Sequence, residues 1–211
     1  MFSPSRRSFL LAAAALAALG SVPARAATDP SAFVDALVQQ ALTLLRNKQM
    51  PDAEREGKFS ALLHQNFDIP RISRFVLGRY WNAASDQERA DFSNIFEQWV
   101  VRTYSARFKE YAGETMKVGS SREESPTSFV VVSQLIHTNG APPAQVNWHV
   151  RKADDNFKIL DVDVEGVSMA LTERDEFSAV IQRSGGTVAS LNQTLKDKLA
   201  NGQTPASGSI Q

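Results

Sequence analysis

The spacing of apolar residues changes twice along the chain, and this change constrains the fold more than any other feature. Four stretches between Thr115 and Glu165 alternate apolar and polar residues, whereas apolar residues recur every three or four positions before and after them. Asn139-Gly140 and Asp154-Asp155-Asn156 indicate turns between strands. Helices, then an antiparallel meander, then helices predict an α+β fold. We expect a curved antiparallel sheet of about four strands that carries helices on one face.

Capping residues refine the expected boundaries. Asp68 is expected to cap a short helix that Gly78 ends. Ser85 and Glu88 have the spacing of a capping box at the start of the longest helix. The expected helices are 30–49, 53–64, 68–77, 85–111, 168–183 and 188–199, and the expected strands are 115–120, 128–137, 144–152 and 157–165.

The helix that follows Ser85 is unusual because apolar residues surround most of it. Its aromatic and aliphatic positions are Phe92, Ile95, Phe96, Trp99, Val100, Tyr104, Phe108 and Tyr111. A helix that packs on one partner needs an apolar stripe of only about 100°. This helix should therefore be covered on more than one side. Simple core packing explains such a pattern, but beside a curved sheet it can also enclose an apolar cavity.

Residues 1–26 have the form of a bacterial export signal. Arg6-Arg7 and Ser8-Phe9-Leu10 precede a short Ala/Leu run, and Ala24-Arg25-Ala26 offers small residues for cleavage. The paired arginines before Ser-Phe-Leu favour the twin-arginine route over an ordinary Sec signal. We therefore expect one domain over 27–201, a disordered tail over 202–211, and a soluble protein in the periplasm.

Charge and cysteine content exclude several functions. Removing the signal takes three of the 23 basic residues and no acid, which leaves 20 against 23 acidic residues, a net charge of −3. That balance disfavours a nucleic-acid groove or a polybasic membrane anchor. The chain contains no cysteine. It therefore has no thiol nucleophile, no cysteine-bound metal and no lipidated cysteine.

A metal site is also not expected. Asp161-Val162-Asp163-Val164-Glu165-Gly166 resembles the start of a calcium loop, but the twelfth position is Thr172 instead of Glu. The pattern is more typical of a strand with Val162 and Val164 facing inward and the acids in water. His64, His137 and His149 fall in separate elements. We find no nucleotide-binding or nucleophile-elbow motif, and expect no cofactor and no catalytic set.

Several strings resemble a known family. They are Phe67-Asp68-Ile69, Val76-Leu77-Gly78-Arg79-Tyr80-Trp81, Val101-Arg102-Thr103-Tyr104, Tyr111-Ala112-Gly113-Glu114 and Asp161-Val162-Asp163-Val164-Glu165-Gly166-Val167-Ser168. In this order and spacing, over about residues 30–200, they resemble the MlaC, or toluene-tolerance, family of periplasmic phospholipid-binding carrier proteins. One departure is Thr172-Glu173-Arg174, where the family often has Asn-Tyr-Arg. A hopanoid-associated branch shares the same strings, so the cargo stays open between phospholipid and hopanoid.

The resemblance implies a nuclear-transport-factor-like fold whose deep apolar pocket holds lipid acyl chains, with no enzymatic activity. It implies three partners: a phospholipid ligand, an inner-membrane ABC transporter complex with MCE domains, and an outer-membrane lipoprotein–porin complex. From periodicity and family position, the expected wall residues are Val76, Leu77, Tyr80, Trp99, Tyr104, Val132, Trp148, Val162 and Val164.

Two other functions stay open. Folds of this shape also serve isomerases and hydrolases that place a carboxylate or tyrosine inside an apolar cavity, and Tyr104 with a buried acid fits that arrangement. Such an enzyme would show an Asp or Glu on an inward strand face, where this sequence places Val and Trp. The third alternative is a docking adaptor whose core is solid.

Overall fold

A computed structural model describes residues 29–203. The predicted export signal and almost all of the predicted tail lie outside these residues. The described helices are α1 (Pro30–Arg46), α2 (Asp52–Asn66), α3 (Ile69–Leu77), α4 (Tyr80–Ala83), α5 (Asp86–Ser105), the 3-10 helix η1 (Ala106–Glu110), α6 (Met169–Arg183) and α7 (Val188–Ala200). The described strands are β1 (Thr115–Ser125), β2 (Ser128–Ile136), β3 (Ala144–Ala153), β4 (Asn156–Val164) and β5 (Val167–Ser168). The predicted α+β class is confirmed.

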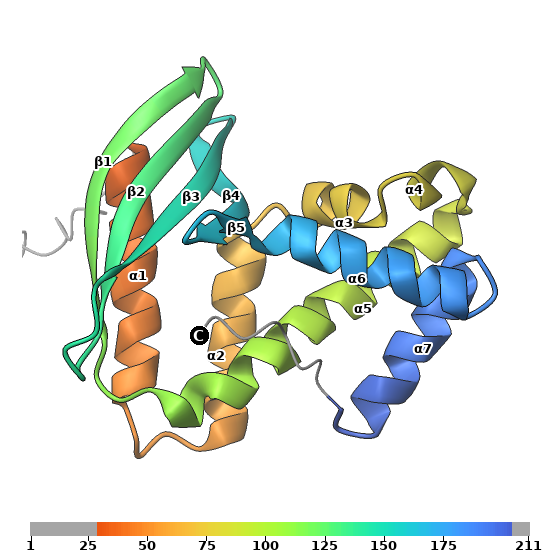
Figure 1. Cartoon of the computed structure of the whole chain (residues 1–211), viewed down its shortest axis with the longest axis horizontal. Coiled ribbons are helices and arrows are strands. Elements are labelled where there is room, and N and C mark those ends of the chain that lie inside the picture. Colours follow the sequence, from red (N-terminus) through yellow and green to blue (C-terminus); the bar gives the residue numbers. More distant parts are fainter. Residues whose placement is uncertain (1–28, 204–211) are drawn as a thin grey trace, which may run out of the picture.

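The strands form an antiparallel meander in the order β1-β2-β3-β4-β5. The sheet curves around α1 (Figure 1). Register is clearest in its middle, where Val131 lies opposite Trp148 and Trp148 lies opposite Val162. Glu165 and Gly166 join β4 to β5 with φ angles of 52° and 80°. Positive φ at both positions is what a type I′ hairpin turn requires, and it aligns the two strands without splaying them.

Two apolar cores hold these elements together. In the first, Val34, Leu37, Val38 and Leu42 of α1 pack against sheet residues such as Val131 and Ile159. In the second, α3, α5, α6 and α7 pack around Phe92, Phe96 and Phe177, whose rings meet at centroid distances of 5.7 to 6.1 Å. Figure 1 shows the sheet and α1 on one side and this helical group on the other.

Four details differ from the sequence-based expectation, of which the first is the single-turn helix α4, which was not expected. Strand β1 continues to Ser125 instead of ending at Ser120, because an outer strand can pair its backbone with β2 while its polar side chains face water. Strand β5 was not expected, since two residues carry no periodicity. The longest α-helix ends at Ser105, and a 3-10 helix replaces its expected last turn. No helix between residues 29 and 203 is both long enough and apolar enough to span a membrane.

Candidate functional site

A half-enclosed cavity of about 290 Å³ lies where the two cores meet. This volume lies near the lower end of the ~300–1,000 Å³ range of small-molecule sites. Helices α2, α3, α5 and α6 and strands β3 and β4 all contribute to its wall. The lining residues are Phe59, Leu63, Phe67, Ile69, Ile72, Phe96, Val100, Tyr104, Trp148, Leu160, Asp161, Val162, Val164, Met169, Ala170 and Glu173. All but Asp161 and Glu173 are apolar or aromatic.

Local periodicity explains how α5 contributes to both the core and the cavity. Phe96, Val100 and Tyr104 are spaced four residues apart and form the stripe that lines the cavity. Phe92 continues this stripe toward the start of the helix, whereas Ile95 and Trp99 lie on another side, and all three pack into the helical core at 0%, 4% and 2% exposure. The predicted coverage on more than one side is therefore confirmed. A capping box fixes where this helix begins: Ser85 N donates to Glu88 Oε2 at 2.7 Å, and Glu88 N donates to Ser85 Oγ at 3.2 Å.

Four of the expected wall residues do line the cavity: Tyr104, Trp148, Val162 and Val164. Trp148 and Val162 are cross-strand partners, so their side chains share the inner face of the sheet. The indole N–H of Trp148 donates to Ser133 Oγ at 2.9 Å, and Ser133 Oγ donates to the Val146 carbonyl oxygen at 3.0 Å. This chain satisfies the one polar atom that Trp148 brings to an apolar wall.

The other five expected wall residues lie elsewhere. Val76, Leu77 and Trp99 are buried in the helical core, which needs apolar residues on the same helices that line the cavity. Tyr80 is partly buried against that core, and its hydroxyl accepts a hydrogen bond from Arg79 at 2.8 Å. Val132 is 37% exposed and lies opposite Asn147, on the outer face of β2. Alternation along a strand identifies the two faces, but the apolar run from 129 to 132 did not show which face is covered.

Sequence reasoning missed most of the wall contributed by α2 and α3. Phe59 and Leu63 are four residues apart on α2, and Ile69 and Ile72 are three apart on α3, so helical spacing was the available signal. Such spacing marks a buried face without telling a core from a cavity wall. Leu160 was also missed, although it is two residues before Val162 and alternation places both on the same face. The β3–β4 pairing shifts between His149 and Val150, and next to this bulge Asp161 also reaches the cavity.

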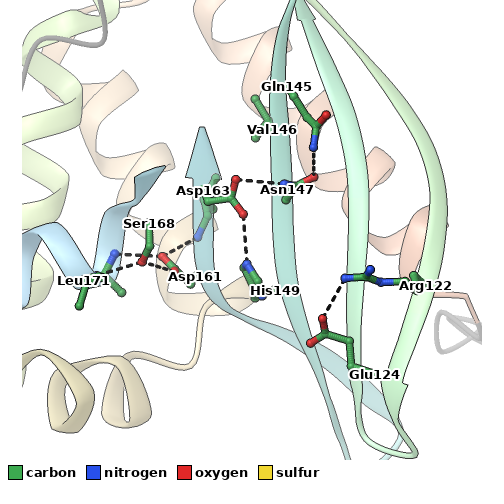
Figure 2. Close-up of polar contacts among 12 residues, drawn as sticks. Arg122, Glu124, Gln145, Val146, Asn147, His149, Asp161, Asp163, Ser168 and Leu171 are labelled. Atoms are coloured by element: carbon green, nitrogen blue, oxygen red, sulfur yellow. Dashed lines mark hydrogen bonds and ion pairs between the residues drawn. The ribbon is translucent and has the colours of Figure 1, made fainter. Parts of the chain in front are cut away.

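The acidic residues of β4 were expected to face water, and the structure shows instead that they are bound by other residues. Asp161 accepts hydrogen bonds from the backbone N–H of Val162 at 2.8 Å and of Ala170 at 2.9 Å, and from Ser168 Oγ. Its carboxylate therefore joins β4 to the first turn of α6 (Figure 2). Asp163 is only 13% exposed and binds Asn147 and His149 at 3.0 and 3.2 Å. Among residues 29–203, no group of three His, Asp or Glu side chains is placed to hold a metal ion.

Glu173 is the unexpected polar residue of the cavity. It is 8% exposed, and its Oε2 has no hydrogen-bond partner in the described part of the chain. Burial, with a smaller contribution from Glu176, raises the pKa of Glu173 to about 7. The nearby Trp99 indole partly offsets this rise in the pKa of Glu173. Burial and the nearby Glu173 also raise the pKa of Tyr104 to about 12. Near neutral pH the cavity thus contains a weakly acidic carboxyl and an un-ionised phenol.

Gly78, which belongs to one of the family-like strings, meets Arg174 of α6 away from the cavity. Gly78 has a φ of 52°, and Arg174 Nε would lie 2.8 Å from a Cβ at that position. The guanidinium of Arg174 also lies 5.3 Å from the centre of the Phe75 ring. Glycine is therefore required here both by its backbone conformation and by the close approach of α6. The Thr172-Glu173-Arg174 segment contributes one residue to the cavity and one to the α3–α6 contact.

Comparison with known proteins agrees with this architecture. The family model "MlaC protein" matches residues 35–197. The intermembrane phospholipid transport system binding protein MlaC of Haemophilus influenzae is 23% identical over 113 residues, which are 52% of this chain and 53% of that protein. The alignment thus spans about half the length of that curated relative.

A solved structure shares the fold. It is the phospholipid-binding protein from Ralstonia solanacearum in complex with a phospholipid, with a TM-score of 0.70 and 23% sequence identity. The superposition covers 82% of this chain and 98% of that one. Since the family model matches well over half of the sequence, this chain belongs to the MlaC protein family.

Proposed function

We propose that this protein is a periplasmic lipid carrier that holds phospholipid acyl chains in the cavity between its two cores. The observation that carries the proposal is the composition of that cavity, whose wall is apolar except for Asp161 and Glu173. Neither acid presents a free, fully ionised carboxylate to the cavity. The carboxylate of Asp161 accepts backbone hydrogen bonds, and burial raises the pKa of Glu173. The match to a protein solved with a bound phospholipid supports the same ligand class.

The energetics of transfer suit a carrier of this kind. Burying one methylene group gains about 0.8 kcal/mol, so two long acyl tails represent on the order of 20 kcal/mol against water. A bilayer offers nearly the same gain, so exchange between a bilayer and an apolar cavity is close to neutral. A cavity near 290 Å³ is small for a two-tailed lipid, so the wall must move apart when cargo enters. The junction of two separate cores is where such movement costs least.

The proposal includes location and partners. The export signal at residues 1–26 would deliver the protein to the periplasm, with the twin-arginine route favoured. There it would carry lipid between an outer-membrane lipoprotein–porin complex and an inner-membrane ABC transporter with MCE domains. Because binding alone is nearly neutral, the direction of transport must come from those complexes.

An enzyme that acts on an apolar small molecule is the second candidate, and Glu173 favours it. A buried carboxyl with a pKa of about 7 is suited to proton transfer near neutral pH, and Tyr104 lines the same cavity. Against this, Glu173 Oε2 has no hydrogen-bond partner among residues 29–203 that would orient the carboxyl group. The acid on the inward strand face, Asp161, is used to hold the start of α6. A carrier needs none of these groups to react.

Mass spectrometry of the purified protein tests the carrier proposal. We expect the wild-type protein exported by a bacterial host to bring phospholipid with it, visible in the native spectrum and in an organic extract. Val162→Asp should lose most of this lipid, because it places a charge on the cavity wall. Val132→Asp is the matched control, since the same change on the outer face should leave lipid content unaltered.

Three results would contradict the proposal in different ways. Wild-type protein free of lipid would favour the enzyme or a docking adaptor. Bound hopanoid in place of phospholipid would keep the carrier and change the cargo. Equal lipid loss in both valine variants, at equal thermal stability, would move the binding site away from the cavity.

A further inference from the structure

Exposed hydrophobic residues gather on one edge of the molecule. Among residues 29–203, four large hydrophobic side chains are exposed: Phe75 at 45%, Val132 at 37%, Val167 at 54% and Leu171 at 48%. Val132 lies on the outer face of the sheet. The other three belong to α3, to β5 and to the first turn of α6, elements that lie next to one another (Figure 1).

Arg174 connects Phe75 and Leu171 into a single surface. Its guanidinium lies 5.3 Å from the centre of the Phe75 ring, and it is three residues from Leu171 on the same face of α6. Val167 and Ser168 lead directly into α6. We call the surface formed by Phe75, Val167, Leu171 and Arg174 the α3–α6 patch.

Positive charge lies along the α3 side of the α3–α6 patch. Arg71 and Arg74 lie on the exposed side of α3 beside Phe75. Residues 69–85 contain three arginines and no acidic residue, although the chain without residues 1–26 has a net charge of −3. Arg71 is paired with Asp68 at 3.3 Å, whereas Arg74 makes no ion pair with any residue of 29–203. The exposed acids nearest in sequence are Glu165 and Asp175, at the margins of the patch.

The patch also borders the cavity. Ile72, one turn before Phe75 on α3, lines the cavity, and so does Ala170, the residue before Leu171 on α6. A surface that holds the α3–α6 patch would therefore lie close to the elements that must part when an apolar ligand enters.

We infer that the α3–α6 patch docks the protein onto the surface of an anionic lipid bilayer. Phe75 and Leu171 would enter the boundary between head groups and acyl chains, as exposed aromatic and aliphatic side chains do in interfacial proteins. Arg71, Arg74 and Arg174 would contact lipid phosphates, each contributing about fivefold in affinity. Arginine suits this position because its long apolar stem can lie along the apolar residues while its charge reaches the phosphates. The net charge of −3 is a sum over the whole chain without residues 1–26, so it does not reveal this local cluster of arginines.

Co-sedimentation with vesicles tests the inference directly. We expect the full-length mature protein to pellet with vesicles of phosphatidylcholine mixed with phosphatidylglycerol and to stay largely in solution with phosphatidylcholine alone. Binding should weaken as salt is added. Phe75→Ser combined with Leu171→Ser should abolish pelleting, and Arg74→Gln should reduce it about fivefold.

Matched controls separate the patch from general surface properties. Val132→Ser removes an exposed apolar side chain from the outer face of the sheet, and Arg122→Gln removes an exposed arginine from β1, so neither should change pelleting. Val162→Asp, the cavity variant, should still pellet, so a failed carrier function would not affect this assay. Arg74→Gln also tests the patch independently of the apolar double variant. The inference would be overturned if the wild-type protein did not pellet with anionic vesicles. It would also be overturned if patch and control variants lost vesicle binding equally.

Discussion

Replacing Glu173 with glutamine should flatten the pH dependence of stability near neutral pH. Glu173 is 8% exposed beside the cavity, and burial raises its pKa from 4.5 to about 7. Between these two values the folded protein holds a proton on Glu173 that the unfolded chain has released. The unfolded state therefore binds fewer protons than the native state, and the free energy of unfolding falls as pH rises.

The size of the effect follows from the shift. A change of one pKa unit corresponds to about 1.36 kcal/mol, so a rise from 4.5 to about 7 gives a loss of roughly 3 kcal/mol across that pH window. For a domain of this size, that loss lowers the thermal midpoint by about 6–12 °C. Glutamine stays neutral throughout. The stability of Glu173→Gln relative to wild type should therefore rise by about 3 kcal/mol between pH 4.5 and pH 8.

Urea denaturation of both proteins at a series of pH values measures this difference. Glu176, whose pKa burial also raises, remains in the variant and keeps part of the slope. Asp175→Asn is the matched control, because it neutralises an exposed carboxylate on the same helix. Its curve should run parallel to that of wild type. If the Glu173→Gln curve is parallel to wild type as well, Glu173 is not buried in the way the structure describes.

Three further changes test other parts of the fold by the same denaturation assay. Gly78→Ala should cost about 1–3 kcal/mol, because it combines a positive φ with a Cβ 2.8 Å from Arg174 Nε, whereas Gly57→Ala, in open space on α2, should be neutral or stabilising. A neutral Gly78→Ala variant would refute the close contact. Ser85→Ala removes the capping box of α5 and should cost about 1 kcal/mol, and no change would mean that Glu88 caps the helix alone. Asp161→Ala leaves the half-buried donors Ser168 Oγ and Ala170 N at the start of α6 without their acceptor, for a cost of about 1–3 kcal/mol and reduced lipid retention. Unchanged stability would show that water replaces the carboxylate.

The elements that local chemistry specifies were predictable. The caps at Asp68 and Ser85 and the glycine after α3 place helix starts and ends within a residue or two, because each satisfies backbone groups of its own helix. The middle strands were predictable for the same reason, since alternation is a property of neighbouring residues. The 3-10 helix after Ser105 and the short β5 were not, because tertiary packing decides how a helix ends and where two residues pair.

The candidate site shows the same division. Tyr104, Trp148, Val162 and Val164 were placed on the cavity because each lies on the apolar side of an element that the sequence defines. Val132 was wrongly placed because both faces of β2 carry valine, and only α1 packing on one of them tells the two apart. Glu173 was missed because an acid in an amphipathic helix is ordinarily read as exposed.

The sequence alone determines the order of helices and strands, their caps and turns, and membership of the MlaC protein family. These features depend on residues close to one another along the chain. The packing of α3, α5 and α6 against one another and against the sheet decides the rest: the cavity, the burial of Glu173 and the α3–α6 patch. The spacing of apolar residues indicates that a face is buried, but it does not show which element packs against that face. Whether two apolar faces close into a core or stay apart around a hollow is decided by packing between distant segments.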